Sequence, residues 1–528
     1  MLNREEMLGR IRSADQWDIV VIGGGATGVG IAIDAASRGY RTVLVERYDF
    51  GKGTSSRSTK LAHGGVRYLQ QGNISLVLEA LRERGLLRQN APHLVHDLAF
   101  VVPRYDWWEG GFYGFGLRVY DIMAGRQGFG RSSLLSLDET IERIPTIETD
   151  GLRGGVVYYD GQFDDARLIV NMVQTAAEQG AVLANYVEAK ALLKADDIVC
   201  GIVAEDAETG ERFEIRGKIV INATGPFADS VRRMDDPDAV PMIDPSQGVH
   251  IVLDRSFLPG DTAIMVPHTD DGRVLFAIPW HDAVLVGTTD TPVTRIEVEP
   301  KPLREEIDFL LSHAARYMTK DPTEDDILSA FAGIRPLVGS SDAENTAALS
   351  RDHTVHISNT GLITIAGGKW TTYRRMAEDT VNQAALLGEL DPGPESSSGL
   401  GRPCVTADLP IHGFHRNAEC FGDLAIYGSD APALQSLIRE RPEYAERIHL
   451  RMPHVVGEIV WAARHEMART VEDFLSRRTR SLLLGAKLSI EMSPKVAQVM
   501  AAELGRDAAW AERQVAEYTE LAQGYIVR

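Results

Sequence analysis

The first part of the chain alternates short apolar runs with polar and glycine-rich stretches. One apolar run covers residues 19–22 and a second covers residues 42–45, and apolar positions recur with helical spacing between them. Apolar runs of this length, bounded by turn signals, are typical of buried strands. The pattern therefore predicts a strand–helix–strand unit from about residue 17 to residue 46.

Later segments show both kinds of pattern again. Short β-type runs alternate with turns over residues 250–290, which predicts an antiparallel sheet. A strand, a Gly-Gly turn and a helix are expected over residues 361–377. The other predicted elements are helices at residues 73–90 and 165–179 and strands at residues 181–188 and 218–221.

A change of composition separates the last quarter of the chain from the rest. Residues 390–398 read LDPGPESSS and have the composition of a linker, and almost all of the sequence beyond them has helical periodicity. We therefore expect a compound region at 1–390, a linker at 391–400 and a helical domain at 401–528. Residues 103–130 are rich in glycine and aromatic residues, which suits a wall of a pocket or interface, or a loop that caps a core.

Composition and charge exclude several classes of protein. The chain has 528 residues, 44% apolar and 25% charged, so two or three globular domains are expected. A formal net charge of −20 argues against a nucleic-acid binder. The three cysteines lie far apart, so neither a disulfide framework nor a metal site is expected. The amphipathic segment at the start of the sequence lacks the apolar core of a secretory signal. No apolar stretch is long enough to span a bilayer. The sequence is still compatible with attachment to a membrane surface.

The first predicted turn carries a G-x-G-x-x-G pattern made by Gly23, Gly25 and Gly28. Such glycines provide a tight turn, close approach of the backbone to a pyrophosphate, and close packing of helix on strand, and the helix N-terminus attracts the phosphates. Glu46 follows the second strand, where its carboxylate can accept from a ribose hydroxyl and would repel a 2′-phosphate. The pattern predicts a dinucleotide site that disfavours NADP, and its alternative is a glycine-rich turn without a ligand.

Features further along the chain favour a flavin dinucleotide over a nicotinamide one. The second strand is followed by a hydroxyl-rich stretch at residues 54–60 instead of another strand–helix unit. Two distant glycine elements, at residues 223–225 and 367–369, each end an apolar strand. A domain assembled from such distant pieces suits a long cofactor buried along its whole length, unless these glycine elements are independent turns.

A series of motifs runs in order from the first glycine turn to the C-terminal region. The motifs are TSSRSTKLAHGGVRYLQQG, NAPHL, FDDARL, NATGP, GVHIVLD, IPWHDAVLVGTTD, FAGIRPL, SRDH, GGKWTTYRRMAED and ARHEMARTVEDFLSRRTR. From about residue 17 to its end, the chain resembles the FAD-dependent, quinone-linked glycerol-3-phosphate dehydrogenases of aerobic bacteria, which are relatives of the mitochondrial enzyme. HGGVRYL, GIRPL and GGKWTTYR together are far more specific than the glycine turn.

The resemblance implies an α/β fold and an activity. A Rossmann domain of the glutathione-reductase type would bind FAD non-covalently, interleaved with an antiparallel-sheet substrate domain (mainly residues 73–160 and 238–345) and followed by an all-α C-terminal cap. The implied reaction is oxidation of sn-glycerol 3-phosphate to dihydroxyacetone phosphate, with hydride transfer from C2 to flavin N5. Electrons would pass to a membrane quinone, with the protein bound peripherally to the cytoplasmic face of the cell membrane. A homodimer is one expected assembly.

The resemblance places three cations, Arg67, Arg335 and Lys369, in the substrate site. Glycerol 3-phosphate is a dianion, arginine grips a phosphate with two bonds, and lysine adds a point charge. A structural salt bridge is the alternative for each of these cations. Tyr68 and Thr372 are expected to neighbour the substrate or flavin, with packing as their alternative.

Two histidines are candidates for the base that takes the C2 hydroxyl proton, because the ordinary pKa of histidine lies near neutral pH. His250 lies in an apolar strand, where a core role is the alternative, and the family match favours the active site. His63 is expected to contact the flavin. Arg335 would stabilise the developing alkoxide, since a guanidinium is a poor base. We predict His250, Arg335 and Lys369 as catalytic residues and leave the base open.

The remaining predicted residues would bind the flavin or pair with one another. Cofactor binding is expected at Gly23, Gly25, Gly28, Glu46, Thr54, Ser55, Ser56, Lys60, His63, Gly64, Gly225 and Gly368. Five arginines of the C-terminal region alternate with acidic residues, which predicts an exposed face or a face of salt bridges between helices, with a surface for a subunit or anionic lipid as the alternative. These arginines are Arg464, Arg469, Arg477, Arg478 and Arg480.

Two other flavoproteins would share parts of this pattern. A glycerol-3-phosphate oxidase would carry out the same substrate half-reaction and pass electrons to oxygen, with release of hydrogen peroxide. An amine- or amino-acid-oxidising enzyme of the same fold would bind a carboxylate and need fewer cations. A flavin-binding scaffold without activity would leave the basic residues and His250 unexplained.

Overall fold

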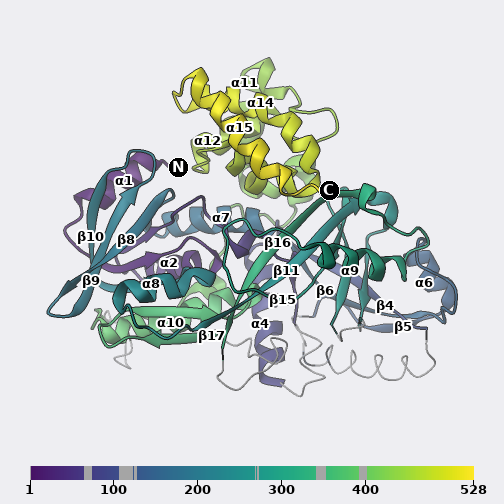
Figure 1. The fold of residues 1–528 in the computed structure, drawn as a ribbon, viewed down its shortest axis with the longest axis horizontal. Helices are drawn as coiled ribbons and strands as arrows, with labels where there is room; N and C mark the ends of the chain where they lie inside the picture. The colour runs from purple at the N-terminus through teal and green to yellow at the C-terminus, as the bar shows by residue number, and fades with distance from the viewer. Residues whose placement is uncertain are drawn as a thin grey trace.

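The structure is a computed structural model that describes residues 2–64, 74–105, 120, 123, 128–267, 269, 273–339, 353–391 and 401–527. Two sheets lie side by side, and helices from the C-terminal region cover one end of the molecule (Figure 1). Arg67 and Tyr68 lie outside the described residues, as do most of residues 103–130 and all but the first residue of the expected linker.

The first sheet forms around the predicted strand–helix–strand unit. In spatial order its main strands are β17 (His353–Ile357), β18 (Ile363–Gly367), β10 (Arg212–Asn222), β1 (Trp17–Ile22), β2 (Thr42–Val45) and β7 (Val182–Ala184). All neighbouring pairs are parallel except β17 and β18. The carboxyl ends of β1, β10 and β18 therefore meet at one edge of the sheet, where open parallel sheets bind ligands.

Burial on both faces explains why the strands at the centre of this sheet are continuous apolar runs. On one face α2 (Ala26–Ser37) packs between α7 (Asp165–Glu178) and α10 (Tyr373–Leu387). The other strands of the sheet are β8 (Val187–Ala195) and β9 (Ile198–Asp206), which extend β10 as an antiparallel meander. The helix α1 (Arg4–Ser13) packs against β7 and β10, and α8 (Ala228–Asp235) packs against β8, β10 and β18.

The single strand predicted at residues 181–188 is two strands in the structure. β7 pairs with β2, whereas β8 pairs with β9. Tyr186, between them, has a φ of +55°, in the left-handed region that interrupts an extended chain. One continuous apolar pattern therefore contributes to two separate pairings.

The second sheet confirms the antiparallel pattern predicted for residues 250–290. Its strands are β3 (Leu61–Ala62), β4 (Val95–Pro103), β5 (Ser133–Leu135), β6 (Gly155–Phe163), β11 (Ile243–Asp254), β12 (Thr262–Val266), β13 (Leu275–Trp280), β14 (Ala283–Gly287), β15 (Thr291–Pro292) and β16 (Ile327–Val338). Val249 and Ile251 of β11 face a core shared with α9 (Arg304–Ala315), and His250 and Val252 face the opposite side.

The C-terminal helices share a hydrophobic core with this opposite side of the second sheet. Phe474 and Val496 belong to the same buried cluster as Leu285 and Phe331 of the sheet. The helices are α11 (Ala431–Glu440), α12 (Val456–His465), a π-helical turn (Asp473–Arg478), α13 (Ser481–Leu484), α14 (Ala486–Glu503) and α15 (Ala508–Gln523). The remaining α-helices in the part of the chain that the structure describes are α4 (Ile74–Asn90) and α6 (Leu137–Arg143). Among the helices that the structure describes, none is long and apolar enough to cross a membrane.

Candidate active site

The three predicted glycine elements meet at the carboxyl edge of the first sheet. A Cβ atom on Gly23 would lie 2.6 Å from the carbonyl oxygen of Ala223, at the end of β10. A Cβ atom on Gly28 would lie 1.9 Å from the carbonyl oxygen of Gly23. Gly225 and Gly368 follow the parallel strands β10 and β18 at the same edge. The contacts at Gly23 and Gly28 require glycine at both positions. The pairing of β1, β10 and β18 brings the three glycine elements to one edge, so they are not independent turns.

The start of α2 has the properties of a phosphate-binding helix N-terminus. Gly25 precedes the helix and supplies no side-chain cap. The backbone N–H of Ala26 donates to Oγ of Ser55 at 3.0 Å, so the hydroxyl-rich stretch reaches this end of the helix. The N–H groups of a first helical turn favour anionic groups. The arrangement fits the pyrophosphate of a dinucleotide.

Glu46 lies at the carboxyl end of β2, as the ribose-binding interpretation requires. Its carboxylate accepts from the backbone N–H of Gly24 at 2.6 Å and of Tyr48 at 2.8 Å. Burial raises the pKa of Glu46, and these two N–H groups oppose that rise. The side chain is therefore held in one orientation beside the glycine turn, which fits an ADP-ribose group.

A cavity of about 320 Å³ adjoins this edge, between the first sheet and the face of the second sheet that carries His250. Its walls come from residues 54–63, from strands β6, β11, β12, β13 and β16 of the second sheet, from the turn after β14, and from residues 367–371. Among its lining residues are Thr54, Arg57, Thr59, His63, His250, Arg273, Asp290, Arg335, Gly368 and Lys369. The cavity thus brings together all three of the predicted catalytic residues.

Strand alternation and register place His250 and Arg335 on the same face. His250 in β11 pairs with Phe331 in β16, so Arg335, four residues further along β16, points to the same side of the sheet. Glycines on neighbouring strands make room for both side chains. A Cβ on Gly287 would lie 2.2 Å from the imidazole of His250, and one on Gly248 would lie 2.3 Å from the guanidinium of Arg335.

The guanidinium of Arg335 is fixed by the turn that follows β14. It donates to the hydroxyl of Thr288 at 3.0 Å and to the carbonyl of Thr289 at 2.9 Å. It also lies 3.2 Å from Oδ1 of Asp290, whose carboxylate accepts from the hydroxyl of Ser246. The predicted GTTD motif therefore orients the arginine, and the cation is held at the cavity wall.

His250 is neutral at neutral pH. Its Nε2 lies 2.9 Å from the hydroxyl of Thr59, and its ring stacks on Phe331 with centroids 5.0 Å apart. Burial lowers the pKa of His250 well below its ordinary value, and the positive charges of Lys60 and Arg335 lower it further. A neutral imidazole in the cavity can accept a proton from a substrate hydroxyl.

Two residues expected to bind the cofactor, Lys60 and Gly64, have protein partners in the structure, and their contact with the cofactor stays a prediction. The ammonium of Lys60 donates to the carbonyl of Ser56 at 2.8 Å and to both carboxylate oxygens of Asp165 at 2.9 and 2.7 Å. These contacts match the donors that a lysine has, so the side chain fixes the loop. The backbone N–H of Gly64 donates to the hydroxyl of Tyr120 at 3.0 Å and lies 3.3 Å from Oδ1 of Asp160.

The other predicted positions differ in whether they line the cavity. The hydroxyl of Thr54, in the cavity wall, donates to the carbonyl of Ile334 at 2.6 Å. Ser56 is buried and is not in the wall. Thr372 is also buried, and its hydroxyl donates to the carbonyl of Lys369 at 3.2 Å, whereas the neighbouring Thr371 lines the cavity. A place for Thr372 beside the substrate or flavin therefore stays a prediction.

Several cavity residues had not been identified from the sequence. Arg57 and Thr59 lie within the quoted TSSRSTK motif, and Asp290 ends GTTD, so their motifs were the available signal. Arg273 precedes the apolar run of β13, and no local pattern distinguishes it from a surface residue. Only the pairing of β13 with β12 and β14 brings it to the cavity.

Comparison with known proteins agrees with this geometry. Residues 18–374 match the family of FAD dependent oxidoreductases, and residues 358–511 match the C-terminal domain of alpha-glycerophosphate oxidase. The mitochondrial glycerol-3-phosphate dehydrogenase of Rattus norvegicus is 42% identical, over 99% of this chain and 75% of its own length. That of Arabidopsis thaliana is 40% identical, over 95% of this chain and 85% of its own.

A solved structure has the same overall fold. The glycerol-3-phosphate dehydrogenase from Bacillus halodurans, complexed with FAD, superposes with a TM-score of 0.80 and 30% identity, over 99% of this chain and 98% of that one. The match spans both sheets and the C-terminal helices, as the family matches do. The chain therefore belongs to the family of FAD-dependent glycerol-3-phosphate dehydrogenases.

Proposed function

We propose that this protein oxidises sn-glycerol 3-phosphate to dihydroxyacetone phosphate and passes the electrons to a membrane quinone, bound peripherally at the membrane. The observation that carries the proposal is one cavity, at the carboxyl edge of the dinucleotide-binding sheet, that contains a neutral histidine and several cations. Non-covalently bound FAD supplies the acceptor for the hydride that leaves C2.

The cations of the cavity bind the phosphate. Arg335 and Lys369, together with Arg273, present positive charge from three different elements, and a guanidinium can form two parallel bonds to phosphate oxygens. Arg335, oriented by Asp290, would also face the C2 oxygen and stabilise the charge that develops there. A dianionic substrate offsets these charges, which explains why an acidic protein concentrates cations in this cavity.

His250 takes the proton of the C2 hydroxyl in this proposal. Its neutral ring can accept the proton, and the bond between Nε2 and Thr59 orients the ring. The C2 hydroxyl loses its proton to His250 while the C2–H electron pair leaves as hydride, so the secondary alcohol becomes a ketone. Binding of the dianion favours the protonated histidine, because a nearby negative charge raises the pKa of an imidazole.

Anaerobic mixing with glycerol 3-phosphate tests the donor. We expect loss of the flavin absorbance on mixing, and its return when a quinone analogue is added. Bleaching by sarcosine or glycine, with none by glycerol 3-phosphate, would contradict the substrate. Stoichiometric peroxide in air without quinone reduction would instead establish the oxidase, which the match to alpha-glycerophosphate oxidase keeps as the second candidate.

Substitution of the two cations tests the site itself. Arg335→Gln and Lys369→Met should slow flavin reduction by glycerol 3-phosphate by about 10²-fold or more while flavin stays bound, because each removes a charge aimed at the dianion. Arg304→Gln is the matched control, since Arg304 lies on the exposed side of α9 and pairs with Glu324. Equal reduction rates in all three variants would refute the proposed site.

A further inference from the structure

The segment that follows β2, residues 46–60, connects the dinucleotide edge with the cavity. At its start Glu46 bonds to the glycine turn. At its end Thr54, Arg57 and Thr59 line the cavity. The conformation of this segment therefore decides where both the ribose-binding carboxylate and the cavity wall lie.

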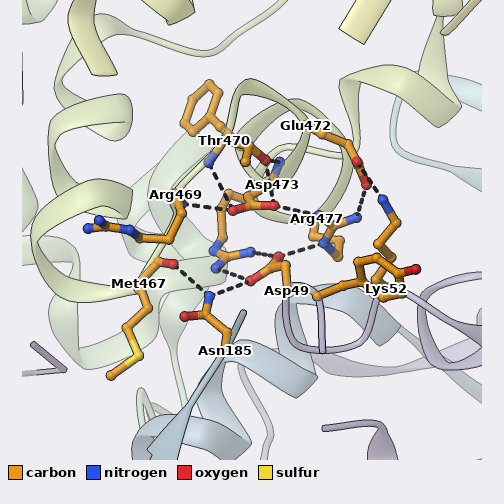
Figure 2. A network of polar contacts seen from close by, with 12 residues as sticks. Asp49, Lys52, Asn185, Met467, Arg469, Thr470, Glu472, Asp473 and Arg477 are labelled. Atoms are coloured by element: carbon orange, nitrogen blue, oxygen red, sulfur yellow. Dashed lines mark hydrogen bonds and ion pairs between the residues drawn. The ribbon is translucent and has the colours of Figure 1, made fainter. Parts of the chain in front are cut away.

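Two arginines of the C-terminal domain hold Asp49, in the first half of this segment (Figure 2). Nε of Arg477 donates to Asp49 at 2.5 Å, and Arg478 donates to both of its carboxylate oxygens at 2.6 and 3.0 Å. The carboxylate is fully buried, and the two guanidinium groups are at most 4% exposed. Asn185 adds a bond at 3.3 Å. Both arginines come from the same π-helical turn, so the fold of the C-terminal domain sets their positions.

A second contact leads from the same turn to the cavity wall. Glu472 accepts from Lys52 at 2.6 Å and from Arg477 at 2.8 Å (Figure 2). Lys52 lies 3.6 Å from Glu299, and Glu299 forms an ion pair with Arg57 at 2.7 Å. Arg57 lines the cavity. Alternating charges therefore extend without a break from the C-terminal domain to the proposed site.

Two further contacts reach the end of the segment. The hydroxyl of Tyr525, close to the C-terminus, donates to the same Glu299 at 2.8 Å. Arg480 pairs with Asp164 at 2.8 Å, and the adjacent Asp165 accepts from Lys60. The C-terminal domain thus contacts the segment, directly or through one or two intervening residues, near its start, middle and end.

These ion pairs are not needed to attach the C-terminal domain. The domain already shares an extensive apolar core with the second sheet. Buried ion pairs recover little net free energy because both charges lose their hydration. Their directional bonds do, however, restrict the buried groups to one arrangement. Charges buried at this place therefore suit the precise placement of a segment.

We propose that the C-terminal helical domain positions the 46–60 segment, with Glu472 and Arg477 as positioning residues that act through Lys52 and Asp49. The part of this inference that concerns substrate binding rests on the proposed function, whereas the part that concerns the flavin does not. The C-terminal domain then contributes to the active site indirectly, because none of the described residues that line the cavity belongs to this domain.

The test compares Glu472→Gln with the matched control Glu208→Gln. Glu208 also bridges the C-terminal domain to the first sheet, through Arg469 at 2.6 Å, and its side chain is 18% exposed against 16% for Glu472. Within the described part of the chain, Glu208 forms its ion pairs with Arg4, Arg469 and Arg506, and none of these lies in the 46–60 segment. Both holoenzymes are heated while two signals are recorded. Flavin fluorescence reports flavin release, and circular dichroism reports unfolding.

We expect Glu472→Gln to release flavin several degrees below its unfolding temperature, while flavin release and unfolding coincide in Glu208→Gln and in the unchanged protein. The KM for glycerol 3-phosphate should rise several-fold in Glu472→Gln with kcat changed by less than about twofold. Coincident release and unfolding in Glu472→Gln, or equal effects in both variants, would overturn the proposal. Flavin release is measured without substrate, so it tests the inference even if the proposed substrate is wrong.

A double substitution identifies the route of the effect. If Glu472 acts through Lys52, the variant with Glu472→Gln and Lys52→Met should release flavin no earlier than the worse of the two single variants. Additive shifts would mean that the two residues act separately, and they would overturn the proposed route. The double variant also removes the lysine that the single substitution leaves with Glu299 as its remaining ion-pair partner, so the comparison remains valid if Glu472→Gln alone folds poorly.

Discussion

At the scale of single residues, the environment of His250 decides its chemical role. The imidazole is surrounded by apolar groups and two cations, so it stays neutral where an exposed histidine would begin to protonate. Thr59 holds one ring nitrogen, and Gly287 leaves space for the ring. His250 therefore lines the cavity and is not enclosed in the core.

The pH profile of the reaction checks this role. Because the pKa of His250 in the protein without substrate lies well below 6.5, its base form persists as the pH falls, and any fall of kcat/KM caused by its protonation should lie well below pH 6.5. His250→Asn should lower kcat by about 10²- to 10⁴-fold, the usual contribution of a general base. Unchanged turnover in this variant would assign the base elsewhere.

A second residue-scale prediction concerns Asp290. Its carboxylate lies 3.2 Å from the guanidinium of Arg335 and accepts from Ser246. Asp290→Asn removes the charge but keeps the shape, so Arg335 should lose its fixed orientation and kcat/KM should fall by about 10-fold or more. Steady-state kinetics measure the effect, and the flavin spectrum controls for cofactor loss. A kcat/KM equal to that of the unchanged protein would show that Thr288 and Thr289 hold the arginine without help.

At the scale of elements, α7 connects parts of the chain that are distant in sequence. At its N-terminus Asp164 caps the helix by accepting from the backbone N–H of Arg167 at 2.9 Å, and it also pairs with Arg480. At its other end Glu178 lies 2.6 Å from Nδ1 of His412. The helix that packs on the dinucleotide-binding domain is therefore joined at both ends to the region after residue 400.

His412 makes the second of these contacts depend on pH. Burial alone would lower the pKa of His412, but hydrogen bonds to Asp430 and Glu178 raise it to about 9. A raised pKa in the folded state means that the stabilisation is complete below pH 6.5 and is lost as the pH rises through about 9. Urea unfolding should show this loss in the unchanged protein but not in His412→Gln. A parallel pH dependence in both proteins would contradict it.

At the scale of the whole molecule, the C-terminal helices and the two sheets form one body. The second sheet shares one core with α9 and another with the C-terminal helices. All five arginines form salt bridges, but most of the partners lie outside the C-terminal helices: Arg464 pairs with Glu503 of α14, whereas Arg469 pairs with Glu208, Arg477 and Arg478 with Asp49, and Arg480 with Asp164. Three of them are buried, which excludes those three from a surface for lipid or for another subunit.

Acid should weaken the interface that Asp49 forms with Arg477 and Arg478. Burial opposes ionisation of Asp49, but Arg478 and Arg477 hold its pKa at about 2, below the ordinary 3.8. A lowered pKa means that the stabilisation is present above pH 3.8 and is lost as the pH falls towards 2. At neutral pH Asp49→Ala should reduce the free energy of unfolding by about 3–5 kcal/mol, because it leaves buried guanidinium groups unpaired.

The matched control for Asp49→Ala is Glu211→Gln, which removes an exposed ion pair with Arg12. Such a pair contributes at most about 1 kcal/mol, so urea unfolding of this variant should resemble that of the unchanged protein. If the free energies of unfolding of the two variants are equal, the buried network adds nothing beyond an exposed pair.

Local patterns predicted the elements and the dinucleotide-binding turn because these depend on contacts close in sequence. The strand–helix–strand unit, the glycine turn and Glu46 lie within one short stretch, and β11, β13 and β14 are apolar runs because most of their residues are buried on both faces. The quoted motifs similarly indicated His250, Arg335 and Lys369, which the structure brings into one cavity. The position of Arg273 depends on strand pairing and had no such signal.

By itself the sequence determined the dinucleotide-binding turn, the strands of the two sheets and the helical C-terminal region, because periodicity and glycine spacing are local properties of the chain. The family was indicated by the resemblance of its ordered motifs. Only the tertiary structure decided which cation has which partner. Lys60 pairs with Asp165, 105 residues away, and Arg477 pairs with Asp49, 428 residues away. The sequence does not indicate which residue a charged side chain will pair with, because burial and pairing exist only once distant elements have packed together.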